Sequence, residues 1–169
     1  MRGRSGMALP IAVMALVAFG LVRPAEAAPK VDRILIEKAE RRLTLVARGR
    51  TLKVYRVALG PSPVGDKTCQ GDGRTPEGTY RISGRNAGSA YHRSLRVSYP
   101  DASDRAAARK AGCDPGGDIF IHGLPNGYGS IGAAHRLRDW TLGCIAVTSA
   151  EIDEIWALVA DGTIVEIRP

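Results

Sequence analysis

The sequence predicts a single domain that is mainly β, with two short helices. Seven short stretches are rich in β-branched and aromatic residues and are separated by turn-forming residues, which is typical of strands. Only two stretches carry the start and stop signals of a helix. The chain has 169 residues, no internal repeat and no linker, so we expect one domain with a substantial core.

The predicted domain begins with three strands in succession. We expect them at residues 31–37, at 42–47 and, after a turn at Arg48 and Gly49, at 51–59. Apolar and polar residues partly alternate in these stretches, as they do in a strand with one buried face. The short turns between them predict a β-meander.

Four further strands are separated by two long loops. We expect these strands at residues 79–83, 94–99, 118–122 and 163–167. Residues 60–78 are rich in Gly, Pro and Asp and predict the first long loop, and residues 123–139 predict the second. Long loops in compact domains are usually functional. The second loop begins directly after His122 and ends shortly before Cys144.

The first predicted helix lies in the stretch DASDRAAARKAG, residues 101–112. Asp101 or Ser103 is suited to cap its N-terminus, because a short polar side chain can accept hydrogen bonds from the free N–H groups there. Gly112 is expected to stop the helix, since glycine readily adopts the left-handed conformation found at helix ends.

The second predicted helix begins with a capping box. Thr148 and Glu151 have the spacing at which each side chain can bond the other's free backbone N–H group. We expect the helix to run over residues 149–160 and to end at Gly162. One face of this helix would carry the apolar residues Ile152, Ile155, Trp156 and Val159.

Residues 1–27 are predicted to be a signal peptide, leaving residues 28–169 as the mature domain. Arg2 and Arg4 precede an apolar run, and Ala25-Glu26-Ala27 has the small-x-small pattern of a cleavage site. A transmembrane anchor is the alternative, but the run is shorter than the roughly 20 residues that span a bilayer. We therefore expect an exported protein of the periplasm or cell envelope, with no stable membrane span after cleavage.

Charge and composition narrow the classes of partner. The formal net charge is +7 for the whole chain and +5 without the first 27 residues. A cationic exported domain is attracted to anionic polymers such as a cell wall, although an ordinary solvated surface explains the charge equally well. Aromatic residues are few and no basic stripe accompanies them, so no nucleic-acid partner is expected.

No cofactor or metal is expected. Residues 127–132 match the text of a dinucleotide-binding fingerprint, but the following residues leave no room for the βαβ unit that such a site requires. No pair of cysteine or histidine residues shows the short spacing of a metal-binding motif.

Cys144 is the candidate nucleophile. A cysteine reacts as its thiolate, and its free pKa of about 8.5 means that it needs a base or a positive charge nearby. The preceding Gly143 permits a tight turn, in which backbone N–H groups could face an oxyanion. A small core residue is the alternative interpretation of Cys144.

The chain has three histidines that could serve as the base. His122 ends a buried strand, and the following Gly123 would let a ligand approach the backbone. A core histidine with satisfied hydrogen bonds is the alternative for His122. His135 lies in the second long loop and is more typical of a solvated residue, while His92 begins another strand.

Three motifs, in order along the chain, together resemble a known family. RTPEGTY at residues 74–80, IFIHG at 119–123 and TLGCIAV at 141–147 are similar to the L,D-transpeptidase catalytic domain, also called the YkuD domain. The resemblance runs from about Val31 to the C-terminus. It implies a β-sandwich-like domain whose cysteine attacks a peptide bond in peptidoglycan.

The resemblance also implies roles for individual residues. Cys144 would be the nucleophile and His122 the proton acceptor and donor, while Thr141 and Gly143 would shape the turn that presents the thiol. The family cuts the peptide stem after its third, L-configured centre and before a D-alanine. The resulting thioester is passed to an amine on a second stem or on another partner such as a lipoprotein.

Two positions depart from the family's usual motif. Many members have histidine at the position of Leu142, and many have arginine or asparagine at the position of Ala146. Leu142 cannot transfer a proton, which leaves His122 or His135 as the base. If water takes the acyl group, the same site is a carboxypeptidase or endopeptidase, so a hydrolase is the second hypothesis. An inactive wall-binding module is the third.

Another stretch, YHRSLRVSYP at residues 91–100, also resembles the broader family. Tyr91, His92 and Arg96 could therefore line the substrate cleft. An edge strand with solvated polar groups is the alternative interpretation.

Cys69 and Cys113 are expected to form a disulfide. Both lie in or beside glycine-rich loops, and two such thiols in an exported protein favour pairing. A pairing of either one with Cys144 would block the nucleophile. The expected bond would connect the first long loop to the segment that precedes the strand at residues 118–122.

Overall fold

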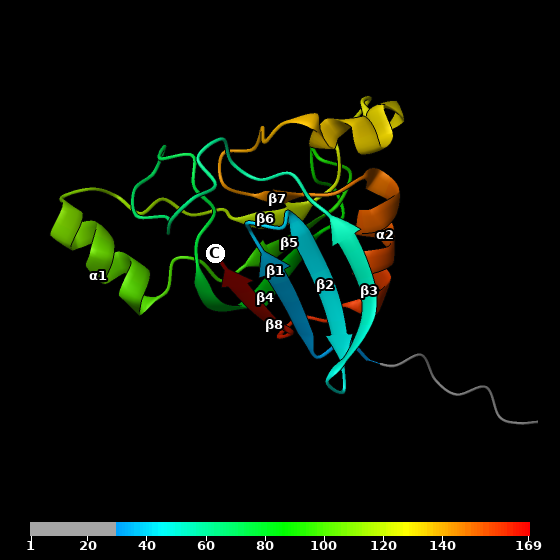
Figure 1. Ribbon diagram of the computed structural model, residues 1–169, viewed down its shortest axis with the longest axis horizontal. Helices are drawn as coiled ribbons and strands as arrows, with labels where there is room; N and C mark the ends of the chain where they lie inside the picture. The colour runs from blue at the N-terminus through cyan, green and yellow to red at the C-terminus, as the bar shows by residue number, and fades with distance from the viewer. Residues whose placement is uncertain (1–29) are drawn as a thin grey trace, which may run out of the picture.

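The computed structural model describes residues 30–169 (Figure 1). In this range the protein has eight strands, two α-helices and one 3-10 helix. The mainly β fold is therefore confirmed. The expected signal peptide at residues 1–27 lies outside the described residues.

The elements are β1 (Arg33–Glu37), β2 (Arg42–Ala47), β3 (Arg50–Arg56), β4 (Gly78–Asn86), β5 (Ser94–Val97), α1 (Ala102–Ala111), β6 (Phe120–His122), η1 (Gly129–Leu137), β7 (Ile145–Ala146), α2 (Ser149–Leu158) and β8 (Ile164–Arg168). All seven expected strands and both expected helices are present, with ends shifted by up to three residues. The 3-10 helix η1 lies inside the stretch expected to be a loop, and β7 was not expected.

The eight strands form one curled sheet in the order β3-β2-β1-β8-β4-β5-β6-β7. Strands β1 to β3 form the expected antiparallel meander. The C-terminal strand β8 lies between β1 and β4, parallel to the first and antiparallel to the second. Strand β4 pairs with β8 through residues 78–81 and with β5 through residues 82–86, so the two halves of the sheet meet along it.

One apolar core lies between the two halves of the sheet. It combines Leu43 and Leu45 of β2 with Leu95, Ile121 and Ile145 of β5, β6 and β7. Helix α2 adds the buried residues Ile152 and Ile155. Full burial of one such side chain stabilises the fold by about 1.5–3 kcal/mol. Strands β6 and β7 therefore rest on a packed core and form a rigid support for side chains on their outer face.

Both α-helices begin at the expected caps. The side chain of Asp101 accepts hydrogen bonds at the start of α1, and Gly112 ends this helix with a left-handed φ of 70°. Thr148 and Glu151 form the capping box of α2. The expected end of α2 was wrong by two residues. The helix ends at Leu158 because Val159 is already extended.

The first long loop is held against the sheet by buried polar contacts. The Lys38 ammonium donates hydrogen bonds to the carbonyl oxygens of Gly65 and Thr75 and to the Glu77 carboxylate. A disulfide joins Cys69 in this loop to Cys113, just after α1.

Within residues 30–169, no helix has the length and apolar character needed to cross a membrane.

Candidate active site

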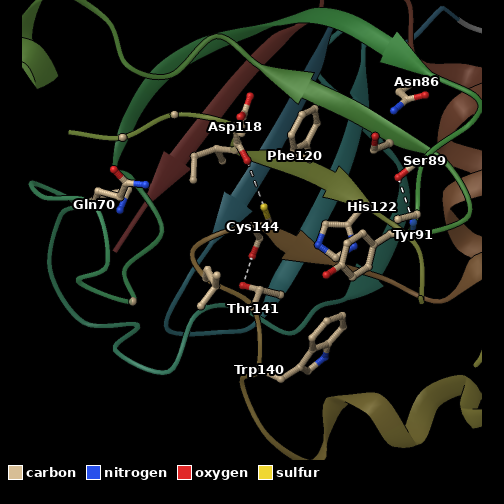
Figure 2. A pocket seen from close by; sticks show the side chains of 18 of the residues that line it. Gln70, Asn86, Ser89, Tyr91, Asp118, Phe120, His122, Trp140, Thr141 and Cys144 are labelled. Carbon is tan, nitrogen blue, oxygen red and sulfur yellow. Dashed lines mark hydrogen bonds between the residues drawn. The ribbon is translucent and has the colours of Figure 1, made fainter. Parts of the chain in front are cut away.

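A pocket of about 620 Å³ lies where the first long loop meets the outer face of β5, β6 and β7 (Figure 2). Cys144 lies near its centre. The aromatic side chains of Tyr91, His122 and Trp140 lie on one side of Cys144, and Gln70 lies on the other. The pocket therefore extends in two directions from the thiol.

The pairing of β6 with β7 places Cys144 and His122 on one face of the sheet. These two strands are parallel, and His122 is paired with Ala146. Because side chains alternate along a strand, Cys144 projects to the same face as Ala146 and hence to the same face as His122. Ser94 of β5, which is paired with His122, lines the same pocket.

The turn before Cys144 is fixed by Thr141 and Gly143. Thr141 Oγ1 donates a hydrogen bond to the Cys144 carbonyl oxygen at 2.7 Å and accepts one from the Gly143 N–H at 3.2 Å. Gly143 has a φ of +124°, and a Cβ added to it would lie 2.5 Å from the Arg74 carbonyl oxygen. These two residues therefore shape the turn.

The same contacts determine which N–H group is available to a ligand. The Gly143 N–H is already bonded to Thr141 Oγ1. Within residues 30–169, the backbone N–H of Cys144 has no hydrogen-bond partner. In this structure, the amide of Cys144 is thus better placed than that of Gly143 to donate to an oxyanion.

The thiol of Cys144 is free and is protonated at rest. Its Sγ lies 3.4 Å from the carbonyl oxygen of Asp118, to which it donates. Burial raises the pKa of this thiol, and the backbone N–H of Phe120 and the positive charge of Lys67 only partly oppose the effect. Attack on a substrate therefore requires a base that removes the thiol proton.

His122 has the tautomer that such a base needs. Its Nδ1 lies 2.7 Å from the carbonyl oxygen of Gly123. A carbonyl oxygen only accepts, so Nδ1 carries the proton and Nε2 is left with a free lone pair. Burial also lowers the pKa of His122, which keeps the imidazole neutral at pH 7.

Asp139, at the end of the second long loop, has a structural role and does not orient His122. Its carboxylate accepts hydrogen bonds from Arg41 and from the backbone N–H of Leu59. The backbone carbonyl of Gly123 is therefore the group that orients His122.

Two aromatic residues enclose the His122 ring. The ring centroid of Tyr91 lies 4.6 Å from that of His122, and the centroid of Trp140 lies 5.8 Å from it. Tyr91 lines the pocket, as the sequence predicted. Sequence reasoning missed Trp140, whose position four residues before Cys144 was the only available signal.

His135 lies outside the Cys144 pocket. It is buried in η1, and its Nδ1 accepts a hydrogen bond from Trp140 Nε1 at 3.4 Å. It lines a second cavity of about 420 Å³, and Trp140 contributes to the walls of both cavities. The expectation of a solvated loop residue was therefore wrong.

Three other predicted residues have structural contacts instead of a place in the pocket wall. His92 Nε2 lies 2.9 Å from the Asp153 carboxylate, and Arg96 forms an ion pair with Asp118 at 3.2 Å. A Cβ on Gly123 would lie 2.9 Å from a methyl group of Ile152. Gly123 is thus required for packing against α2, where the sequence had suggested ligand approach.

The two positions that depart from the family motif lie in different surroundings. Leu142 is 84% exposed at the edge of the pocket. Ala146 is fully buried opposite His122.

Within residues 30–169, no group of three or more His, Cys, Asp or Glu side chains is arranged to hold a metal ion. The arrangement is suited to covalent catalysis by a thiol with an imidazole base.

The chain matches the family described as the L,D-transpeptidase catalytic domain, YkuD, over residues 31–167. The Escherichia coli protein YafK, whose name places it among the L,D-transpeptidases, is 30% identical over 133 residues. That match covers 75% of this chain and 46% of YafK. The chain therefore spans about half the length of this curated relative.

Solved structures show the same fold. The helical cell shape determining protein Pgp2 from Campylobacter jejuni matches with a TM-score of 0.63 and 25% identity, covering 83% of this chain and 48% of Pgp2. An L,D-transpeptidase from Xylanimonas cellulosilytica matches with a TM-score of 0.55 and 17% identity. That match covers 86% of this chain and 64% of the other, and at this identity it supports the fold alone.

Proposed function

Because the chain belongs to the L,D-transpeptidase catalytic domain family, we propose that it is an exported cysteine L,D-transpeptidase that acts on the peptide stems of peptidoglycan. The observation that carries the proposal is the placement of Cys144 and His122 on one face of β6 and β7 in a single pocket. His92 and His135 do not line that pocket, so His122 is the base.

Acylation follows from the protonation states of the two side chains. As substrate binds, His122 Nε2 takes the thiol proton and Cys144 Sγ bonds to the carbonyl carbon of the third, L-configured centre. The developing oxyanion receives a hydrogen bond from the Cys144 N–H. The carbon–nitrogen bond then breaks, His122 returns the proton to the leaving amine, and D-alanine departs from a thioester.

Deacylation uses the same base. An incoming amine attacks the thioester carbon, His122 takes its proton, and the Cys144 sulfur leaves and is protonated again. A new amide bond joins the two partners. The acceptor is an amine on a second stem or on a lipoprotein.

Hydrolysis is the second candidate function, and one observation favours it. Position 146 lies directly opposite His122, and here it is a buried alanine. Strand β7 therefore offers no polar side chain beside the base to hold an acceptor amine. Water could then take the acyl group, which would make the enzyme an L,D-carboxypeptidase or endopeptidase.

The first experiment is mass spectrometry of the mature protein after incubation with tetrapeptide-stem muropeptides. Cross-linked products that have lost D-alanine are expected for the transpeptidase, and trimmed stems alone would show the hydrolase. Cys144→Ala should abolish both products. His122→Gln should lower turnover by about 100-fold or more, the usual contribution of a general base.

A matched histidine provides the control. His92→Asn changes an exposed histidine outside the pocket wall, and asparagine tolerates the positive φ of 67° at this position. Its turnover should stay within about twofold of the unchanged protein. If the Cys144→Ala protein still forms either product, the assignment of the nucleophile is wrong. A folded, unchanged protein that binds stems without altering them would indicate a wall-binding module.

A further inference from the structure

Lys67 is a buried ammonium group in the wall of the pocket. Its side chain is 4% exposed, and its Nζ donates to the Cys69 carbonyl oxygen and to Asp72 Oδ1, both at 2.9 Å. An ammonium group has three N–H donors, and a buried donor without a partner costs stability. Within residues 30–169, the third N–H donor of Lys67 has no acceptor.

The other buried lysine shows what a purely structural ammonium looks like. Lys38 is equally hidden from solvent, but its three donors reach three acceptors, in Gly65, Thr75 and Glu77. Lys38 does not line the pocket, whereas Lys67 does. The donor that remains on Lys67 is therefore available to a ligand.

The partner Asp72 leaves much of the Lys67 charge available. One oxygen of the Asp72 carboxylate accepts from Lys67 and the Arg74 N–H, and the other accepts from the N–H groups of Thr68 and Cys69. Four donors thus share this one negative charge. The charge of Lys67 also reaches the Cys144 thiol, where it weakly opposes the rise in pKa that burial causes.

The position of His122 assigns a direction to the substrate. His122 has to protonate the leaving amine, so the amine side of the scissile bond lies next to it, at the aromatic end of the pocket. The acyl side then extends from Cys144 toward the opposite end, where Figure 2 shows Gln70. Lys67 donates to the carbonyl oxygen of Cys69, next to Gln70, and so lies at this end. Gly71 follows Gln70 in the chain, and a Cβ added to Gly116 would lie 3.2 Å from the Gln70 side chain.

We propose that Lys67 binds a free carboxylate on the acyl side of the bond that Cys144 attacks. The preferred substrates are then donor stems that carry a carboxylate at this place, and stems with a carboxamide there are poor donors. The other charged side chain in the pocket wall is Asp118, which is mostly exposed and already paired with Arg96. The glycines around the acyl end let the substrate come close to the ammonium. This inference rests on the proposed function for the orientation of the substrate.

The test measures binding, so that it does not depend on turnover. The Cys144→Ala protein is titrated by calorimetry with a tetrapeptide stem that has free carboxylates, and with the same stem whose acyl-side carboxylates are amides. We expect the free carboxylate form to bind about 10- to 100-fold more tightly, as for a charge-assisted hydrogen bond. For a third stem, amidated only at the terminal D-alanine, the change in affinity that the amide causes should not depend on Lys67.

Two added changes separate recognition from structure. Lys67→Met with Asp72→Asn removes both charges together and leaves no buried charge unpaired. The ratio of the affinities for the free-carboxylate stem and the amidated stem should then fall to about one. Asp72→Asn alone keeps the ammonium and should keep the preference. Thermal unfolding of both proteins shows whether the loop remains folded.

Three results would overturn the inference. The first is that the Cys144→Ala protein, with Lys67 in place, binds the two stems with equal affinity. The second is a preference that survives in the double variant, and the third is a preference that follows the D-alanine carboxylate. If binding depends on the carboxylate but the unchanged protein shows no turnover, the role of Lys67 is upheld and the transpeptidase proposal is contradicted. Failure of the inference and failure of the proposed function are therefore distinguishable.

Discussion

At the scale of single residues, two histidines near Trp140 are held in opposite tautomers. The Nδ1–H of His122 donates to a backbone carbonyl, which leaves Nε2 free to accept a proton. The Nδ1 of His135 instead accepts from the indole N–H of Trp140, which can only donate, so Nε2 of His135 carries the proton. That Nε2 is buried and has no partner among residues 30–169. Only His122 therefore combines a free lone pair with a place in the pocket.

His135 should make the protein sensitive to mild acid. Burial, together with the charge of Arg136, lowers the pKa of His135 to about 4, against about 6.5 in the unfolded chain. Below pH 6.5 the unfolded chain thus binds more protons at this site, and stability falls as pH falls from 6.5 to 4. His135→Leu removes this contribution. Its unfolding temperature should decline less over that pH range than the temperature of the unchanged protein.

The remaining acid sensitivity is common to both proteins. The pKa of His122 is also lowered by burial, but His122 is present in both, so its contribution cancels in the difference between the two curves. Parallel curves between pH 6.5 and 4 would contradict the prediction. Turnover of His135→Leu should remain within a few-fold of the unchanged protein, because His135 does not line the pocket.

At this scale the sequence predicted the two candidate catalytic side chains but not their surroundings. Cys144 and His122 were predicted because their motifs are local and specific. Lys67 and Trp140 were missed because each is brought to the pocket by a loop, and no spacing in the chain marks a residue for that place. Asp118 contributes its backbone carbonyl, which any residue could supply.

At the scale of elements, the turn before β7 tolerates glycine alone at position 143. The φ of +124° disfavours other residues, and an added Cβ would meet the Arg74 carbonyl oxygen at 2.5 Å. Gly143→Ala should therefore displace Cys144 and reduce turnover by about tenfold or more, in line with backbone strain of about 1–3 kcal/mol. Steady-state kinetics and circular dichroism would measure the loss of turnover and the retention of the fold.

A second glycine serves as the matched control. Gly84 in β4 has no atom within 4 Å of an added Cβ, and its φ is outside the left-handed region. Gly84→Ala should keep turnover within about twofold. Equal turnover in the two variants would show that the turn does not position the thiol.

The sequence was least informative about two elements near the site, β7 and η1. Strand β7 has two residues, too few for a periodic pattern, and it exists because β6 pairs with it. The 3-10 helix η1 has no side-chain cap, and Gly132 inside it has non-helical dihedral angles. Both features depend on tertiary contacts. The longer strands and the capped helices were predicted because their signals are local.

At the scale of the whole molecule, the sheet brings together segments that are distant in the chain. Strand β8 pairs with β1 and β4, although residues 38–163 separate it from β1 in the chain and residues 87–163 separate it from β4. The pocket lies between the first long loop and the β5–β6–β7 half of the sheet. Strand order cannot be inferred from the chain alone, so the sequence predicted the strands and not their arrangement in the sheet.

The disulfide links two loops that contribute walls of the pocket. It joins Cys69 to Cys113, which are 44 residues apart, and the Gln70 N–H next to it donates to the Asp114 carbonyl oxygen at 2.7 Å. One wall contains Lys67 and the other contains Asp118. The bond thus restrains the acyl end of the pocket and does not contact the Cys144–His122 pair.

Replacing both cysteines, Cys69→Ser with Cys113→Ser, should lower the free energy of unfolding by about 3–4 kcal/mol for a loop of this length. Because the change loosens the wall that contains Lys67, KM for the donor stem should rise while kcat changes little. Denaturant unfolding and steady-state kinetics measure the two effects. Cys144→Ser is the matched control, since it keeps the disulfide and its stability but loses turnover. A fall in kcat at constant KM would instead mean that the disulfide supports the Cys144–His122 pair.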